Sequence, residues 1–173
     1  MTTVKIKNIK QGDLFSFIAD DGKYKALLCT GIYIDKSPNN FTFCALTYSS
    51  YEKPTIEITK ESSFFGVGDA TKNNIYKHSD EELEKMWIIH PEIKPYILGC
   101  YNFIIWRKDF MKFRDNFEFI GNLNVVNNID KNGNGSVNAS NWEGLKNLFN
   151  EKLYEIMSQR DQKIFKLKSI IKE

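Results

Sequence analysis

The stretch DLFSFIADDGKYKALLCTGIYID, residues 13–35, has the pattern of two antiparallel strands joined by a tight turn. Apolar side chains alternate in part along Asp13–Asp20 and again along Lys23–Asp35, which is the period of a strand. Between these segments, the Asp-Gly pair at residues 21–22 is a strong signal for a hairpin turn. Gly31 in the second segment indicates a bulge or a tight bend. The sequence therefore predicts a β-hairpin.

Two further strands are expected along the next part of the chain. Phe41–Tyr48 predicts one strand, after a turn at residues 37–40, and Pro54–Thr59 predicts a shorter one in which Ile56 and Ile58 face the same way. The first three strands are fairly apolar on both faces, so another element must cover the sheet. We expect a fold of the α+β class, with a strongly curved antiparallel sheet or a small SH3-like β-barrel.

The second half of the chain adds strands and an aromatic helix. Tyr96–Trp106 predicts a buried strand, and Phe117–Val126 predicts one more. Between them, Phe110 and Phe113 are spaced as on one face of a helix, with Lys and Arg residues interspersed. This helix either covers the sheet with its aromatic face or binds nucleic acid or a membrane with its basic residues. The acidic residues among the basic ones favour the first interpretation.

Capping-box patterns mark the expected starts of two more helices. Ser79 with Glu82 predicts a short middle helix near residues 80–89. Ser140 with Glu143 repeats the spacing, and an apolar stripe at helical intervals follows. We expect a long C-terminal helix there, of up to about thirty residues.

The length of 173 residues fits one domain with a sizeable core. Within it, we expect residues 1–128 to form a β-rich, barrel-like part, and residues 129–173 to form a polar loop and the C-terminal helix packed on it. A hydrophobic fraction of 42% with 14% aromatic residues argues against disorder. The net charge of +2 gives no strong field toward nucleic acid or an anionic membrane, so an electrostatic partner would need a local patch.

The side chains that most often carry chemistry form no catalytic or zinc-binding motif. Cys29, Cys44 and Cys100 include no CxxC pair, and an odd number without a signal peptide is typical of a reducing compartment. His78 and His90 have no second ligand at metal spacing. No phosphate-binding loop, nucleophile elbow or membrane-spanning segment is found. We therefore expect a cytoplasmic protein that is not an enzyme and has no cofactor.

A polar loop, DKNGNGSVNASN at residues 130–141, has the outline of a calcium-binding loop. The residues at the ligand positions of such a loop are Asp130, Asn132, Asn134, Ser136, Asn138 and Asn141. Asp130 is the single carboxylate in this set, and Asn141 replaces the usual bidentate Glu, so calcium affinity would be too weak for cytosolic concentrations. The same residue types favour turns before a capped helix, which is the preferred interpretation.

The basic residues raise a small-barrel nucleic-acid-binding protein as an alternative function. Its patch would consist of Lys23, Lys25, Arg107, Lys108, Lys112 and Arg114, beside aromatic residues such as Tyr24 and Trp106. If these side chains gather on one face of the fold, nucleic-acid binding is favoured, whereas scattering counts against it. The near-neutral charge already makes nucleic acid the less favoured partner.

The stretch from Gln11 to Tyr33 resembles the start of immunity protein family 26 of bacterial polymorphic toxin systems. Members begin with a Gly-Asp-hydrophobic strand, a polar turn ending in Asp-Gly-Lys-Tyr, and a second strand. The matching residues are Gly12, Asp13, Phe15, Asp21, Gly22, Lys23 and Tyr24. Phe117–Leu123 is similar to a later strand of these proteins, in which Gly follows an apolar pair.

The resemblance implies a non-enzymatic immunity protein that binds and neutralises a cognate toxin domain. Inhibitors of nuclease toxins are often strongly acidic, whereas this chain is near neutral. We therefore expect an interface based on shape and exposed aromatic residues rather than on charge alone. The family offers no toxin-contact motif to match here, and the residues leave the oligomeric state open.

Overall fold

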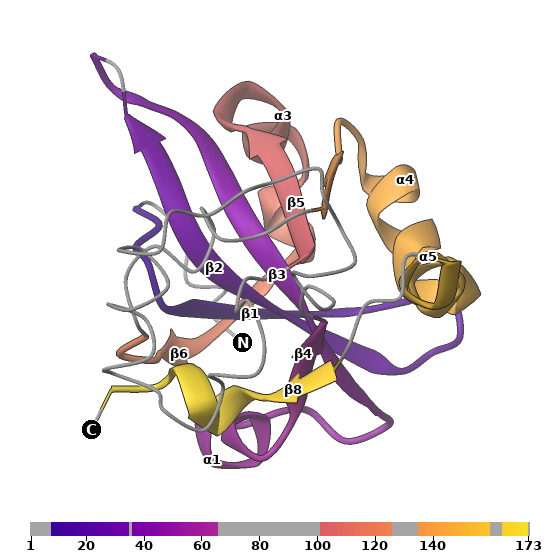
Figure 1. Ribbon diagram of the computed structural model, residues 1–173. Helices are drawn as coiled ribbons and strands as arrows, with labels where there is room; N and C mark the ends of the chain where they lie inside the picture. Colours follow the sequence, from indigo (N-terminus) through magenta and orange to yellow (C-terminus); the bar gives the residue numbers. More distant parts are fainter. Residues whose placement is uncertain (1–7, 35, 66–100, 126–134, 160–163, 173) are drawn as a thin grey trace.

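The computed structural model describes residues 8–34, 36–65, 101–125, 135–159 and 164–172 (Figure 1). These residues form an α+β fold around an eight-stranded sheet, which confirms the expected class. The strands are β1 Asp13–Ile18, β2 Tyr24–Ile34, β3 Pro38–Ser50, β4 Ser63–Phe65, β5 Tyr101–Trp106, β6 Glu118–Asn122, β7 Gly135–Asn138 and β8 Ile164–Lys166. The helices are α1 Ile56–Lys60, α3 Arg107–Phe113, α4 Trp142–Asn147 and α5 Leu153–Gln159.

The predicted hairpin is confirmed. β1 pairs antiparallel with β2, from Leu14 opposite Leu28 to Ile18 opposite Tyr24. The turn contains Gly22 with a φ of 75°, a left-handed conformation that glycine adopts readily. Between β2 and β3 the register shifts next to Gly31, at the position where a bulge was expected.

The second hairpin turns earlier than its sequence suggests. Pro38 is already paired with Ile34, so β3 begins inside the segment 37–40 that was expected to form the turn. β6 is also shorter than the expected strand over residues 117–126. It flanks β1 as a neighbour on the side opposite β2.

The sheet is not closed, so the expected SH3-like barrel is wrong and the antiparallel sheet is the form adopted. The outer edge of β3 is divided: residues 40–44 pair with β5, whereas Leu46 pairs with β4. β4 then pairs with β8, and β7 lies parallel to β5. The path of paired strands runs from β6 to β8, and no ladder joins these two end strands, so the described sheet stays open. An isolated bridge between Val125 and Ile171 links the segments that follow β6 and β8.

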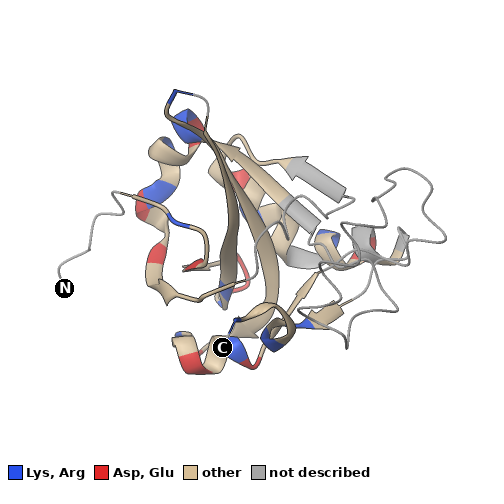
Figure 2. Cartoon of the chain, turned by 60° about the vertical axis from the view of Figure 1, so that its left-hand side comes forward, with Lys and Arg blue, Asp and Glu red and all other residues tan. Residues whose placement is uncertain are grey.

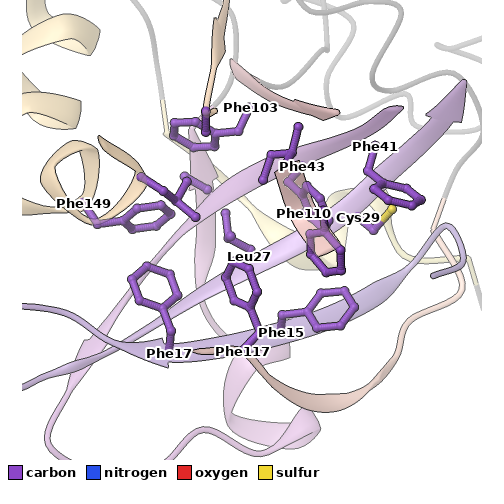
Figure 3. Close-up of a cluster of buried hydrophobic side chains, with 14 of the residues drawn as sticks. Phe15, Phe17, Leu27, Cys29, Phe41, Phe43, Phe103, Phe110, Phe117 and Phe149 are labelled. Carbon is purple, nitrogen blue, oxygen red and sulfur yellow. The ribbon is translucent and has the colours of Figure 1, made fainter. Parts of the chain in front are cut away.

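Both faces of the central strands are buried, each in its own core. On one face, Phe15, Phe43 and Phe110 pack together with ring centroids 5.9–6.4 Å apart (Figure 3). Phe110 comes from α3, which confirms that the aromatic face of this helix covers the sheet. On the other face, Leu14 and Leu28 pack in a second cluster that β4, β8 and the C-terminal residues complete.

The segment Pro54–Thr59 forms helix α1, so the expected strand is wrong. Thr55 is the N-cap, and its Oγ1 accepts a hydrogen bond from the Ile58 backbone N at 3.3 Å. Thr59 Oγ1 donates to the Thr55 carbonyl at 2.6 Å. These local bonds favour the helix. Ile56 packs against the second core while Ile58 is exposed, so the two side chains do not share a face.

The expected long C-terminal helix is replaced by three shorter pieces. α4 passes into a π turn at Leu148–Lys152 and then into α5. Further along, residues 164–166 form β8, because Phe165 packs on Phe64 with ring centroids 5.7 Å apart. The cap also differs, since Asn141 and not Ser140 is the N-cap of α4. The expected helix near residues 80–89 lies outside the described residues.

Candidate functional site

A cleft of about 870 Å³ is lined by Phe65 of β4 and by three longer segments that are far apart in the sequence. They are the β1–β2 turn, the last residues of β3 and the helical segment that contains α5. Figure 1 shows α4 and α5 beside that end of the sheet. The cleft lining includes Asp21, Lys25, Ser49, Phe65 and Tyr154.

Two backbone irregularities face this cleft. Between the pairs Leu27–Ala45 and Lys25–Ser49, β2 advances two residues while β3 advances four. β3 therefore carries two extra residues in a bulge, and Thr47 and Tyr48 from it line the cleft. The opposite wall includes residues of the π turn. Bulges and π turns are both frequent at functional sites, and here two of them meet.

A buried ammonium group lies in the lining of the cleft. The Lys25 side chain is 8% exposed, and its Nζ donates to Asp21 Oδ2 at 2.8 Å and to Ser49 Oγ at 2.7 Å. The Lys23 backbone N also donates to Asp21 Oδ1, at 3.0 Å. The hydrogen bond from Lys25 is the main cause that lowers the pKa of the Asp21 carboxyl below its ordinary value. Lys25 thus has the charged partner that a buried lysine requires.

An ion pair joins the hairpin turn to the helical wall. Lys146 Nζ, on α4, donates to Asp20 Oδ1 at 2.7 Å and lies 3.0 Å from Glu143 Oε2. The hydrogen bond to Asp20, followed by the one to Glu143, raises the pKa of the Lys146 ammonium. Lys146 therefore stays charged at neutral pH and holds α4 against the turn.

The apolar part of the cleft comes from β4 and the helical segment. The rings of Phe65 and Tyr154 meet edge to face, with centroids 5.0 Å apart. Phe65 is buried, whereas 53% of Tyr154 is exposed. The Tyr154 ring therefore rests on the core through one edge and offers the remainder to a ligand.

The residues of the proposed nucleic-acid patch fall into two groups. Lys23 and Lys25 lie near the β1–β2 turn, and Lys25 is buried. Arg107, Lys108, Lys112 and Arg114 lie on α3 or directly after it. α3 begins directly after Trp106. Asn40 of β3 pairs with Trp106 on one side and with Tyr33 of β2 on the other, so these three residues lie in one row across the sheet. Tyr33 is eight positions beyond Lys25 in β2. At the rise of a strand, Lys25 and Trp106 are therefore roughly 26 Å apart along the sheet. α3 runs back over the sheet from Trp106, so that Phe117, after its end, packs on Phe17, the β1 partner of Lys25.

Acidic side chains also interrupt the basic group on α3. Lys112 Nζ lies 2.9 Å from Asp109 Oδ1, and Arg114 lies next to Asp115. Figure 2 shows Lys and Arg distributed among Asp and Glu over the described chain. Lys25 is buried and acidic side chains lie among the basic ones of α3, so the six residues do not form one continuous basic surface. The nucleic-acid alternative stays a prediction.

An exposed aromatic surface lies at the end of the sheet away from the cleft. Tyr33 is 59% and Trp106 is 47% exposed. Lys108 Nζ lies 5.3 Å from the centroid of the Trp106 ring, which is a cation–π distance.

The calcium-loop residues have separate structural positions. Asp130, Asn132 and Asn134 lie outside the described residues. Ser136 and Asn138 belong to β7, opposite Asn102 and Ile104 of β5, and the Asn141 side chain caps α4. Within the described ranges, no three His, Cys, Asp or Glu side chains are grouped as a metal site. Calcium binding stays untested.

The side chains considered for catalysis are not assembled in the described structure. His78, His90 and Cys100 lie outside the described residues. Cys29 and Cys44 are buried in different cores, on opposite faces of the sheet. No described helix has the length and apolar character needed to cross a membrane.

The sequence did not identify Ser49 and Tyr154 as site residues. Tyr154 lies outside the apolar stripe of the expected helix, and this position of an aromatic residue on the polar side was the one signal in the sequence. The position of Ser49 depends on the β3 bulge. Comparisons of the chain with known protein families, with curated proteins and with solved structures find no match.

Proposed function

We propose that this protein is a non-enzymatic immunity protein that binds and neutralises a cognate bacterial toxin domain in the cytoplasm. The observation that carries the proposal is the position of the turn that resembles immunity protein family 26. Asp21, from this turn, lines the cleft, and Lys23 holds the Asp21 carboxylate through its backbone N. Gly12 and Asp13, also in the resemblance, have structural roles instead, since Asp13 Oδ1 accepts a hydrogen bond from Asn122 of β6.

The character of the cleft supports a protein as the ligand. Its lining combines apolar and aromatic side chains with an ion pair whose charges cancel, so it offers a protein segment both apolar contact area and hydrogen-bonding groups. The chain carries a net charge of +2, so attraction by charge alone would be weak. Shape and a few aromatic contacts would then supply most of the affinity.

The experiment that tests the proposal uses the toxin domain encoded by the gene next to that of this chain. The domain is expressed in bacterial cells with and without the chain, and the two proteins are then purified by size-exclusion chromatography. We expect growth to be restored by the chain and a stable complex to elute. Unrestored growth together with separate elution of the two folded proteins would contradict the proposal.

A further inference from the structure

The cleft presents a cluster of hydrogen-bonding groups that its own contacts do not exhaust. Within the described part of the chain, Lys25 Nζ has two acceptors, Asp21 Oδ2 and Ser49 Oγ. An ammonium group has three N–H groups, so one remains for a ligand. Ser49 Oγ accepts from Lys25, which leaves its own O–H as a donor. Two donors therefore lie 2.7 Å apart in the lining of the cleft.

Acceptors lie directly beside these donors. The Asp21 carboxylate accepts from Lys25 Nζ and from the Lys23 backbone N. A carboxylate has about four lone-pair sites, so acceptor capacity remains. The Asp21 side chain is 39% exposed, which leaves it accessible from the cleft. The cluster can thus receive a C=O group and an N–H group side by side.

The charges of the cluster select the ligand. Lys25 and Asp21 cancel each other at 2.8 Å. A ligand carboxylate would be repelled by Asp21, and a ligand ammonium would be repelled by Lys25. A neutral amide avoids both repulsions and uses the donors and the acceptor together. Lys152 and Glu155, which also line the cleft, have opposite charges, and Asp20, the remaining charged residue of the lining, is paired with Lys146.

We propose that the cleft binds an extended peptide segment that presents a neutral amide to Lys25, Ser49 and Asp21 and an apolar side chain to Phe65 and Tyr154. The half-exposed Tyr154 ring supplies the apolar surface next to the polar cluster. That the segment belongs to a toxin rests on the proposed function. The preference of the cleft for a neutral amide beside an apolar side chain does not depend on that function.

Four small probes test the chemistry without a toxin. N-acetylphenylalaninamide has a neutral amide and an aromatic side chain, whereas N-acetylphenylalanine adds a carboxylate and phenylalaninamide adds an ammonium group. N-acetylalaninamide lacks the aromatic ring. Each is titrated into the ¹⁵N-labelled full chain, and amide shifts are followed by NMR. We expect millimolar binding of N-acetylphenylalaninamide, with shifts at Tyr48, Ser49 and Tyr154, and roughly threefold or more weaker binding of the other three.

Matched variants locate the contact. Ser49→Ala removes a donor, and it should weaken N-acetylphenylalaninamide binding roughly three- to tenfold. Tyr154→Ala should weaken it at least as much. Ser37→Ala and Trp106→Ala, at the opposite end of β2 and β3, should leave it unchanged. Tighter binding of a charged probe, or shifts confined to residues around Trp106, would overturn the proposal.

The same variants separate this inference from the proposed function. If the wild-type chain binds the toxin domain and both Ser49→Ala and Tyr154→Ala weaken that complex, both ideas are supported. Toxin binding that is lost in Trp106→Ala and kept in the cleft variants would overturn the assignment of the bound segment to the toxin and leave the immunity function standing. Probe binding in the cleft without any toxin binding would support the peptide-binding cleft and contradict the immunity function.

Discussion

Lys146 and Asp20 are 126 residues apart in the sequence, yet Lys146 Nζ donates a 2.7 Å hydrogen bond to Asp20 Oδ1. This contact joins the first hairpin to the helical segment, and so holds two walls of the cleft at a set distance. The Lys146 side chain is 14% exposed, which limits the competition from water. The ion pair is therefore one of the contacts that join the two walls, beside the hydrogen bonds within the turn itself.

Replacing Lys146 by Met should loosen the hairpin turn. The apolar stem is kept while the charge that holds Asp20 is lost, so the turn should open more often. Hydrogen exchange of the Gly22 backbone N–H, which donates to the Ala19 carbonyl, should become several-fold faster. Lys168→Met, which removes an exposed ion pair with Glu61, serves as the control. Equal exchange rates in the two variants would contradict the role of Lys146.

Gly12→Ala should destabilise the fold more than Gly22→Ala. Both glycines have positive φ, at 86° and 75°, which costs an alanine about 1–2 kcal/mol. At Gly12, an added Cβ would also lie 1.8 Å from the Leu123 carbonyl oxygen, whereas at Gly22 the nearest atom is 3.9 Å away. The Gly12 variant should thus lose more than about 2 kcal/mol of unfolding free energy in urea titrations. Similar losses for the two variants would contradict the clash.

Asn141→Ala should cost about 1 kcal/mol of unfolding free energy, because Asn141 Oδ1 accepts from the Gly144 backbone N at 2.7 Å. Ser140→Ala should change stability by less than about 0.5 kcal/mol, since Ser140 is exposed and does not cap α4. Thermal unfolding of both variants measures the difference. A larger loss in Ser140→Ala would restore Ser140 as the cap.

Acidification should remove the stabilisation that Asp21 provides. Its pKa is lower in the folded chain than in the unfolded chain, chiefly through the hydrogen bond from Lys25. The unfolded chain therefore binds the proton more readily, and the stabilisation is complete above the ordinary Asp pKa of about 3.9 and is lost as the pH falls through the folded pKa. The stability difference between wild type and Asp21→Asn should be constant from neutral pH to about pH 5 and shrink below pH 4. Urea titrations across this range measure it, and a difference that does not vary with pH would contradict the assignment.

The parts of the fold that local sequence determines were predicted well. The hairpin followed from alternating apolar residues and one Asp-Gly pair, all within residues 13–35. Phe110 and Phe113 indicated the covering helix for the same reason. The prediction of a strand at Ile56 and Ile58 was wrong because a run of six residues fits both the period of a strand and that of a helix. The Thr55 cap favours the helix.

Contacts between distant segments could not be predicted. Residues 164–166 continue an apolar pattern that suits a helix, and they form a strand because β4 lies beside them. The cleft has the same origin. Lys25, Ser49 and Tyr154 line it because of a bulge in β3 and a π turn before α5, and neither irregularity leaves a clear sequence signal. Of the described residues that the sequence singled out as a candidate site, Lys25 alone contributes its side chain to the hydrogen-bonded cluster with Asp21 and Ser49 in this cleft.

The two cores share the same strands, and this determines how the protein should respond to heat. Phe43 belongs to one core and Cys44, the next residue, to the other. Melting one core would therefore withdraw β3 from both. The described fold should absorb heat in a single transition whose calorimetric and van't Hoff enthalpies agree. Because β1, β2 and β3 contribute side chains to both cores, we expect proteases to cleave the described fold only through its global unfolding.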